Sequence, residues 1–285
     1  NDAATFNFKE NAVIIDAVFG TGLNRRTNKK EIDLITFLNG VKLPKVSIDM
    51  PSGLLADQMI TDQTVIFKAD ETLSFQFWKK TFLHPETGIY CGKVHILDIS
   101  LSEEFIHDEI TSDYVIDDQL IHRIYKTRSE FSHKGNFGKT TIIAGSFGRV
   151  GAAVLAVKAA LKTGSGLTFV HAPKCGYEIL QTSCPEAIYL YGGENHHDRF
   201  QIDHDTVVGI GPSLGINTDT ESAFMDFLKS CDQTMVLDAD ALNIISRHSQ
   251  FLARIPENSI ITPHPKEFER LFGITENSFD RVELA

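Results

Sequence analysis

The sequence predicts two doubly wound α/β domains, each built around a parallel sheet. Short apolar runs alternate with stretches of helical periodicity along most of the chain, and this alternation is typical of parallel strands joined by helices. Several runs end in glycine-rich or acidic clusters, which is where open α/β sheets bind ligands. The sequence turns polar and acidic between residues 100 and 132. We place the boundary there, between domains 1–112 and 113–285.

The bulk composition is that of an ordinary globular protein. Of the 285 residues, 42% are hydrophobic and 23% are charged, which is not the composition of a disordered chain. The formal net charge of −11 argues against nucleic acid as a partner, because phosphate backbones require a surplus of Lys and Arg. A nucleotide ligand stays open, since a few backbone N–H groups and one or two cations can bind its phosphates.

Cysteine use and hydropathy predict a cytoplasmic protein. The four cysteines form no C-x-x-C pair, so neither a disulfide framework nor a zinc knuckle is expected, and a reducing compartment fits. No apolar run approaches the ~18 residues of a membrane span, and the start lacks a signal-peptide pattern. We therefore expect no membrane partner.

The first domain begins with a strand–helix–strand unit. Residues Ala12–Phe19 are a nearly continuous apolar run that ends in Gly20-Thr21-Gly22, the pattern of a buried parallel strand that leads into a loop. Apolar residues recur at helical spacing over Lys30–Leu38, and a second strand follows at Lys45–Asp49. Further strands are predicted at Thr64–Phe67, Thr72–Phe75 and Lys93–Leu97.

The second domain resumes the same alternation. Strand Thr140–Ala144 is followed by the glycine-rich loop Gly145–Gly151 and by a helix over Ala152–Lys162, which ends at Gly164. Separated by helical stretches, further strands are predicted at Leu167–Val170, Thr206–Ile210, Thr234–Leu237 and Ser259–Ile261. This order favours an open parallel sheet with helices on both faces.

The two ends of the chain predict a fragment that is truncated on both sides. The first residue is Asn1 rather than Met, and a hydrophobic strand begins already at Ala12. Residues Asn277–Ala285 have the pattern of an N-cap and two helical turns that stop without a C-cap.

Two acidic residues mark the candidate site of the first domain. Asp16 and Asp49 each end a predicted strand, and neighbouring parallel strands would bring both carboxylates to one crevice. One could bind a cation while the other transfers a proton. The glycines at 20 and 22 would let the backbone approach a phosphate closely. The structural alternative is that Asp49-Met50-Pro51-Ser52-Gly53 is only a turn with an Asx-type cap.

Three successive strands of the second domain end in small or polar residues. They lead into Gly211–Gly215, Asp238–Asn243 and Thr262–Glu267, which together supply carboxylates and a histidine. A binding site explains this convergence better than chance. The loop Gly145–Gly151 precedes a helix and could bind an anion, although its spacing is not that of a P-loop.

A histidine-rich stretch looks less promising. His196, His197, Asp198 and His204 lie in a polar connection whose spacing is not that of metal ligands, and we expect a solvated loop.

In this order, the motifs resemble those of bifunctional NAD(P)H-hydrate repair enzymes. Segments Asp16–Leu23 and Ile48–Gly53 look like the second half of the epimerase domain, which is Rossmann-like. The later motifs look like the dehydratase domain, which is related to ribokinase folds: His133-Lys134-Gly135, Ala144-Gly145-Ser146, Gly151-Ala152-Ala153, Gly211–Gly215, Leu237–Asn243 and Thr262–Pro265. The resemblance spans nearly the whole chain, and it implies that both domains are incomplete here.

The resemblance implies roles for individual residues. Asp16 and Ser52 match the family's potassium ligands, and Asp49 matches a substrate-binding and acid/base residue. The loop around the phosphates of the hydrated substrate is matched by Gly20, Thr21, Gly22, Leu23, Asn24, Arg25 and Arg26. In the dehydratase, positions that line the hydrated nicotinamide nucleotide are matched by Ala152, Gly211 or Gly215, and His264. Asp238 and Asn243 match the family motif without an assigned role.

The sequence departs from the family pattern in four places. The Asn-Asn-Gly-Gly-Asp motif of the epimerase and the Gly-x-Gly-Asp motif of the dehydratase, which supplies a catalytic aspartate and part of the ADP site, are both absent. We therefore expect the chain to be inactive by itself. Ser213 and Lys266 stand where the family usually has glycine, which puts the local backbone geometry in doubt.

For a complete enzyme, the resemblance implies interconversion of the R and S forms of NADHX and NADPHX, followed by ADP-dependent dehydration of the S form to NAD(P)H. It also implies K⁺ in the epimerase part, ADP in the dehydratase part and a homo-oligomer. Two alternatives remain open: a ribokinase-like small-molecule kinase fused to a Rossmann-like module, and a non-catalytic nucleotide-binding protein.

Overall fold

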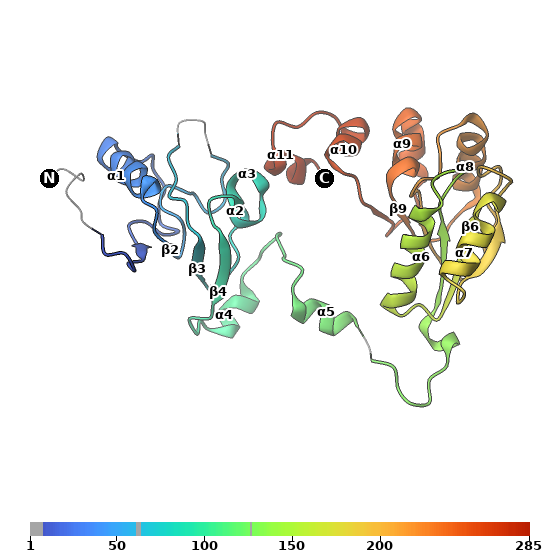
Figure 1. The fold of residues 1–285 in the computed structure, drawn as a ribbon, viewed down its shortest axis with the longest axis horizontal. Coiled ribbons are helices and arrows are strands. Elements are labelled where there is room, and N and C mark those ends of the chain that lie inside the picture. Colours follow the sequence, from blue (N-terminus) through green and yellow to red (C-terminus); the bar gives the residue numbers. More distant parts are fainter. Residues whose placement is uncertain (1–7, 61–63, 126) are drawn as a thin grey trace. The chain divides into compact units, whose positions relative to one another are not determined.

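The computed structural model describes residues 8–60, 64–125 and 127–285. The chain forms two compact units (Figure 1): the first comprises Asn1–Lys126 together with Thr275–Ala285, and the second comprises Thr127–Ile274. The domain boundary placed at residue 113 from the sequence stays a prediction.

The first unit contains a four-stranded parallel sheet. Its strands lie in the order β1-β2-β3-β4, with the bounds β1 Ile14–Asp16, β2 Lys45–Ile48, β3 Glu71–Phe75 and β4 Lys93–Leu97. The pairing Asp16↔Ser47 places the end of β1 beside the end of β2. The connections that follow these two strands therefore emerge at the same edge of the sheet.

The described residues of the first unit form six helices. They are α1 Lys29–Gly40, α2 Lys80–Leu83, α3 Pro85–Gly88, α4 Glu103–Asp108, α5 Asp118–Ile124 and α11 Ser278–Leu284. Four of the six, α1, α4, α5 and α11, begin at a side-chain cap. At α1, the Asn28 side chain accepts from the Glu31 N–H while the Glu31 carboxylate accepts from the Asn28 N–H, which is a capping box. At α11, the predicted N-cap Asn277 is confirmed, and Glu86 accepts from the first helical N–H at 2.8 Å.

The second unit contains a six-stranded parallel sheet in the order β10-β9-β8-β5-β6-β7. Its strands are β5 Lys139–Ile143, β6 Leu167–Ala172, β7 Ile188–Tyr191, β8 Val207–Ile210, β9 Met235–Leu237 and β10 Ile260–Ile261. Its helices are α6 Gly151–Thr163, α7 Tyr177–Ser183, α8 Thr218–Ser230, α9 Ala239–Arg247 and α10 Pro265–Phe272, with short 3-10 turns η2 Lys134–Phe137, η3 Lys174–Gly176 and η4 Ser249–Arg254.

The strand order of the second unit reverses at β5. From β5 the chain proceeds outward through β6 and β7, and then returns to place β8 on the other side of β5. Connections from adjacent strands that leave in opposite directions open a crevice at the carboxyl edge. The loops after β5 and β8 lie at this edge, so the fold itself places Gly145–Gly151 beside Gly211–Gly215.

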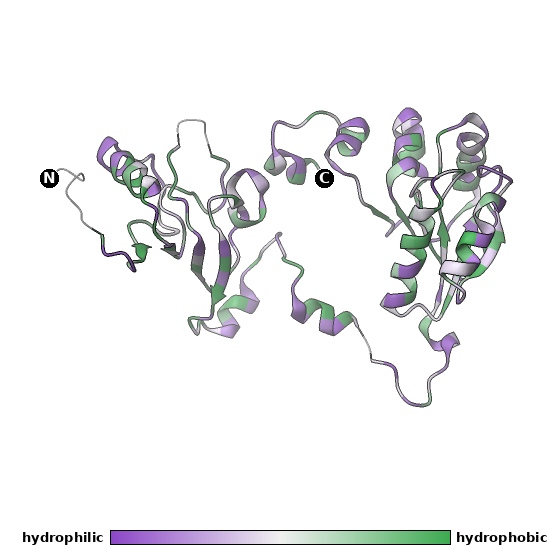
Figure 2. Ribbon diagram, in the orientation of Figure 1, coloured by the Kyte–Doolittle hydropathy of each residue, from purple (hydrophilic) through white to green (hydrophobic). Residues whose placement is uncertain are grey.

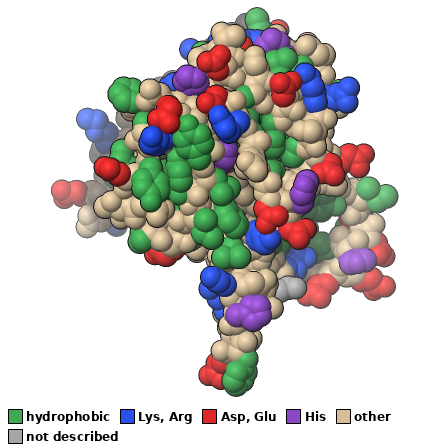
Figure 3. All heavy atoms as spheres, turned by 90° about the vertical axis from the view of Figure 1, so that its right-hand side faces the viewer, with side chains coloured by type: hydrophobic (Ala, Val, Ile, Leu, Met, Phe, Trp, Pro, Cys, Tyr) green, Lys and Arg blue, Asp and Glu red, His purple; other side chains and the backbone are tan. Residues whose placement is uncertain are grey.

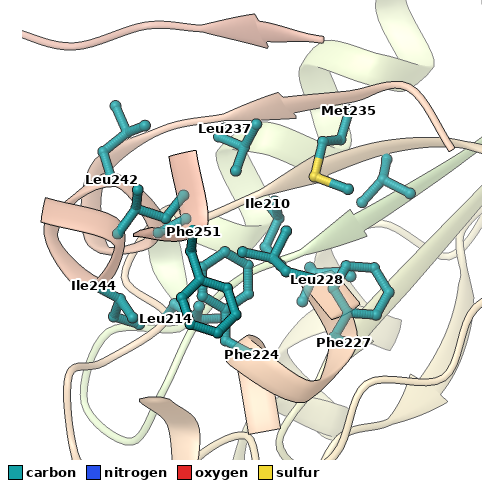
Figure 4. Close-up of a cluster of buried hydrophobic side chains, with 14 residues drawn as sticks. Ile210, Leu214, Phe224, Phe227, Leu228, Met235, Leu237, Leu242, Ile244 and Phe251 are labelled. Atoms are coloured by element: carbon teal, nitrogen blue, oxygen red, sulfur yellow. The ribbon is translucent and has the colours of Figure 1, made fainter. Parts of the chain in front are cut away.

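Each unit has its own hydrophobic core. In the second unit, α8 and α9 pack Phe224, Leu228 and Leu242 against strands β8 and β9 (Figure 4), and Figure 2 shows that these strands are mostly hydrophobic. In the first unit, one cluster contains Met50 and Leu54, and another contains Ile14 and Ile35. These cores fix the strand ends from which the loops depart.

The sequence predicted most strands at or within two or three residues of their bounds, but not all of them. Thr64–Phe67 is not a strand: it is irregular, and Phe67 is buried through loop packing with one backbone bond to Ser52. Strand β7 was not predicted. The apolar run Ala12–Phe19 contributes only Ile14–Asp16 to the sheet.

In the described parts of the chain, no helix is both long enough and apolar enough to cross a membrane. On the face that Figure 3 shows, acidic and basic side chains are interspersed with apolar ones rather than gathered into one charged patch.

Candidate functional site

The first cluster lies where β1 and β2 end. Asp16 is 2% exposed, and its carboxylate accepts hydrogen bonds from Ser52 Oγ at 2.6 Å, Ser52 N at 2.7 Å and Ser47 Oγ at 3.0 Å. Ser52 Oγ in turn accepts from the Phe19 N–H at 3.0 Å. Asp16 and Ser52, which the sequence paired, are therefore in direct contact and tie the loop after β1 to the loop after β2.

The second acidic residue, Asp49, contacts the glycine loop. Its Oδ2 accepts from the Thr21 N–H at 2.9 Å, and a Cβ at position 20 would lie 2.7 Å from the same oxygen. Only glycine fits at Gly20 without displacing this carboxylate. Asp49 Oδ1 lies 3.4 Å from Lys79 Nζ, and both side chains are largely buried.

Lys79 is held firmly in this position. Its Nζ donates to Ser74 Oγ at 2.9 Å, to the Phe75 carbonyl at 2.8 Å and to the Phe77 carbonyl at 3.0 Å. The ammonium therefore sits at the carboxyl end of β3 and compensates the charge of Asp49. Lys79 could not be predicted from the sequence, because nothing local distinguishes it from Lys80.

The backbone at Asp49 is strained. Its φ is +66°, and the Met50 N–H bonds to the Ile48 carbonyl across it. A non-glycine residue in the left-handed region costs on the order of 1–2 kcal/mol. The surrounding bonds keep the carboxylate turned toward the loop despite that cost.

The remaining residues of the predicted phosphate loop lie nearby. The Leu23 N–H bonds to the Gly20 carbonyl at 3.2 Å and closes a turn, and Gly22 has open space around its Cα. Asn24, Arg25 and Arg26 line a cavity of about 390 Å³ together with Gly53. Arg25 is paired with Glu31 through two hydrogen bonds, at 3.0 and 2.8 Å, which leaves Arg26 as the more available cation.

In the second unit, backbone bonds join the loops on either side of the strand reversal. The Gly145 N–H donates to the Pro212 carbonyl at 2.9 Å, and the Gly215 N–H donates to Asp240 Oδ2 at 2.9 Å. Arg149 Nη1 lies 3.9 Å from the same Asp240 carboxylate oxygen. The loops after β5, β8 and β9 thus meet at one edge, whereas the sequence predicted convergence for the ends of β8, β9 and β10.

The glycines here have structural reasons to be glycine. Gly211 has φ +130°, and a Cβ there would lie 1.8 Å from the Asp238 carbonyl. Ser213 has φ +52°, so the doubt about backbone geometry at this departure from the family pattern was justified. Lys266 raises no such problem, because it lies in the first turn of α10 and its N–H donates to His264 Nδ1 at 3.2 Å.

His264 caps a helix at the same edge of the sheet. It is the N-cap of α10, and its Nε2 lies 3.1 Å from Oε1 of the buried Glu267. Ala152 is half-buried in the first turn of α6. Asn243 accepts from Arg270 Nη1 at 2.6 Å, so it joins α9 to α10. Asp238 caps α9 by accepting from the Ala239 N–H.

The prediction for the histidine-rich stretch was wrong at His197. The ring is fully buried, and its Nε2 lies 3.0 Å from the Gly145 carbonyl. His196 is partly exposed beside Asp219, and Asp198 and His204 are exposed. The predicted solvated loop is therefore confirmed at these three residues. Burial of His197 depends on long-range packing against His171 and Phe200, which local polarity does not reveal.

Two family models match the chain. Residues 140–285 match the model described as NAD(P)H-hydrate dehydratase, and residues 1–81 match the model of the YjeF-related protein N-terminus. The first match covers more than half of the chain. The chain belongs to the NAD(P)H-hydrate dehydratase family.

Several relatives combine both parts. The chain is 32% identical over 273 residues to the bifunctional NAD(P)H-hydrate repair enzyme of Vibrio cholerae, with 96% of this chain and 54% of that protein covered. It is 33% identical to the enzyme of the same name from Escherichia coli, with 96% and 52% covered. The chain thus spans about half the length of the curated relatives that it matches.

Solved structures with some similarity cover parts of the chain. A ribokinase-like superfamily protein from Enterococcus faecalis has a TM-score of 0.47 and 24% identity, and covers 56% of this chain and 57% of its own. An ADP/ATP-dependent NAD(P)H-hydrate dehydratase from Bacillus subtilis, co-crystallized with ATP and Mg²⁺, has a TM-score of 0.43 and 27% identity, covering 55% and 54%.

Within this family, the structure adds residues that the sequence analysis did not assign. Lys79 neutralises Asp49, Asp240 holds the Gly215 N–H, Glu267 supports His264, and His197 holds the Gly145 carbonyl. Asp240 and Glu267 belong to motifs that were recognised, so their importance could have been inferred. The other two become visible only in three dimensions.

Proposed function

We propose that this chain takes part in repair of hydrated nicotinamide nucleotides, with epimerisation at the Asp49 cluster and ADP-dependent dehydration at the crevice of the second unit. Support comes mainly from one observation: relatives named bifunctional NAD(P)H-hydrate repair enzymes align with 96% of the chain, across both units. A small-molecule kinase would account for the second unit only. A non-catalytic nucleotide-binding protein would account for neither reaction.

The geometry around Asp49 suits proton transfer beside a bound phosphate. Asp49 contacts the Thr21 N–H and Lys79, so a carboxylate base, a backbone donor and a compensating cation occur together. Interconversion of R and S hydrates requires removal and return of protons, which a positioned carboxylate can perform. The loop from Gly20 to Arg26 supplies N–H groups and Arg26 for the phosphates.

Potassium fits the chemistry of Asp16 and Ser52. Asp16 is almost fully buried, yet among the described residues no Lys or Arg forms an ion pair with it. A buried carboxylate without a cation is costly, and carboxylate and hydroxyl oxygens suit hard cations. These two residues would hold K⁺, which would offset the charge of Asp16 near the phosphate loop.

The potassium proposal predicts an effect on stability. KCl should raise the unfolding temperature above that in tetramethylammonium chloride of equal ionic strength, because a ligand of the folded state stabilises it. Asp16→Asn should abolish the difference. Asp33→Asn, which changes an exposed side chain on α1, should keep it. Equal unfolding temperatures of the unmodified chain in both salts would count against a potassium site.

The crevice of the second unit is proposed to bind the S hydrate. The first turn of α6 with Ala152, the loop Gly211–Gly215 and His264 line the carboxyl edge of one sheet. A bound ADP would supply the activation that a hydroxyl, as a poor leaving group, requires. The chain's own part is to hold the substrate and exclude water. A homo-oligomer and a cytoplasmic location remain predictions.

The two-site proposal is tested by separating the activities in the full-length protein. Asp49→Asn should slow epimerisation by about 100-fold or more, the usual contribution of a general acid/base, while dehydration of purified S-NADHX with ADP changes little. His264→Ala should do the reverse. His264→Asn keeps an acceptor for the α10 cap and separates loss of binding from loss of the cap. NADH recovery and chromatography of the two epimers report each activity.

Matched surface variants, Asp33→Asn and His107→Ala, should affect neither reaction, since both side chains are well exposed. If Asp49→Asn and His264→Ala reduced both activities equally, with unfolding temperatures unchanged, the assignment of two separate sites would be wrong.

A further inference from the structure

We propose that His197 is a positioning residue: it fixes the Gly145–Gly151 loop at the crevice of the second unit through the Gly145 carbonyl. The link to catalysis rests on the function proposed above. The link to the loop rests on geometry alone, and the two can be tested separately.

The hydrogen bond defines the state of the His197 ring. Nε2 lies 3.0 Å from the carbonyl oxygen of Gly145, and a carbonyl can only accept, so Nε2 carries the proton. The ring is fully buried, and burial lowers its pKa to about 4. At neutral pH the ring is therefore an uncharged donor with an unprotonated Nδ1.

A second buried histidine supports the first. The His171 ring is stacked on His197 with centroids 5.3 Å apart, and Phe200 stacks on His197 at 5.4 Å. Both Nδ1 atoms lack a hydrogen-bond partner among the described residues. A Cβ at Gly192 would lie 2.9 Å from each of these nitrogens. Gly192 therefore sets how closely the backbone and the two rings can pack.

The segment that carries His197 is itself anchored to several elements. Thr220 Oγ1, in α8, donates to the His197 carbonyl at 2.8 Å, and the Lys174 N–H donates to the Gly193 carbonyl at 2.8 Å. The same segment also holds the loop a second time, because the Phe147 N–H donates to the Asn195 carbonyl at 2.8 Å. Residues 192–198 thus form a support behind the loop.

The Gly145 residue is consequently fixed on both sides. Its N–H donates to the Pro212 carbonyl across the strand reversal, and its carbonyl accepts from His197. Gly145 has φ +85°, where the backbone is free to move unless neighbours hold it. Loss of the His197 donor should loosen the loop and the first turn of α6 without removing any residue that lines the crevice.

The test compares three substitutions of one ring. His197→Phe keeps the stacked volume without a donor, His197→Asn has a side chain too short to reach as Nε2 does, and His197→Gln places an N–H near the Nε2 position. Amide hydrogen exchange should quicken about 5- to 10-fold in residues 147–151 of the Phe and Asn variants, the equivalent of one hydrogen bond of about 1 kcal/mol. The Gln variant should exchange nearly as slowly as the unmodified chain.

A pair of glycines provides a matched control. Gly192→Ala should displace both rings and reproduce the loosened loop, whereas Gly40→Ala, at an exposed position in the first unit with open space around its Cα, should not. In the full-length protein, the Phe variant should raise the KM for S-NADHX several-fold with a smaller change in kcat, and the Gln variant should restore it.

The possible outcomes distinguish the positioning role of His197 from the proposed function. Slow loop exchange in His197→Phe would overturn the positioning role, and so would equal loosening in the Gln and Phe variants. Exchange could become faster only in the loop while the unmodified full-length protein fails to convert NADHX to NADH. That result would support the positioning role and refute the proposed function.

Discussion

At the scale of single residues, strain gathers where strands end. The structure places Asp49, Gln76, Ser213 and Ala239 at positive φ, directly after or a few residues beyond the ends of β2, β3, β8 and β9. Such conformations persist only where neighbouring bonds enforce them, and they are frequent at binding sites. In both units, these four residues lie at the carboxyl edge that carries the candidate sites.

Ser213 allows the cost of this strain to be measured. Ser213→Gly should raise the free energy of unfolding by about 0.5 kcal/mol, because relief of a left-handed conformation slightly exceeds the entropy that glycine adds to the unfolded chain. Ser213→Ala keeps the strain and should bring no gain. Denaturant unfolding of the chain measures both.

Gly211→Ala is the opposite case on the same loop. Its Cβ would meet the Asp238 carbonyl at 1.8 Å, so we expect a loss of more than about 2 kcal/mol. A loss for Ser213→Gly, or no loss for Gly211→Ala, would mean that the loop backbone differs from the one described.

At the scale of elements, the sequence predicted what local patterns encode. Helix α6 follows from its apolar spacing and from Gly164, which ends it, strand β4 follows from its apolar residues, and α11 follows from its Asn277 cap. The run at 64–67 was taken for a strand because its residues are mostly apolar, yet Ile66 and Phe67 are buried in an irregular segment. Strand β7 is an edge strand of four residues that was not predicted, although the shorter strands β9 and β10 were.

The candidate sites divide in the same way. Asp16 and Ser52 were paired through the family resemblance, and the structure brings them into contact. Lys79 and His197 could not be predicted, because their roles depend on contacts with residues 30 and 52 positions away along the chain. A polar neighbourhood in the sequence gave no sign that His197 is buried.

The buried histidines predict how the second unit responds to acid. Burial is the main cause that lowers the pKa of His171 to about 3 and that of His197 to about 4, while both are near 6.5 when unfolded. Below pH 6.5 the unfolded state therefore binds more protons. The free energy of unfolding that these histidines contribute has its full value above pH 6.5. It falls as the pH drops toward 4, by up to about 1.4 kcal/mol per pH unit for each histidine.

Unfolding measured from pH 7 to 4 checks this expectation. His171→Gln keeps an acceptor for the Gln201 N–H and should make the decline shallower, whereas His107→Gln, at a well-exposed position, should leave it unchanged. An identical decline in all three proteins would assign acid sensitivity to the carboxylates instead.

At the scale of the whole molecule, each unit has its own core and its own candidate site. The core of α8 and α9 lies entirely in the second unit, while the clusters around Met50 and Ile14 lie in the first. Proteins built of parts with separate cores commonly open part by part. The two proposed activities should therefore tolerate damage to the other unit's core.

A pair of core substitutions tests that independence. Phe224 is fully buried in the second unit. The substitution Phe224→Ala should lower the free energy of unfolding of this unit by about 3–5 kcal/mol. Amide protection should fall in β5, β6, β8 and β9 and persist in β1–β4, because no side chain of the first unit belongs to this cluster. Phe82→Ala, in the Met50 cluster, should produce the converse pattern. If either change lowered protection equally in both sheets, the units would unfold as one cooperative body, and loss of either activity in a core variant would carry no information about where its site lies.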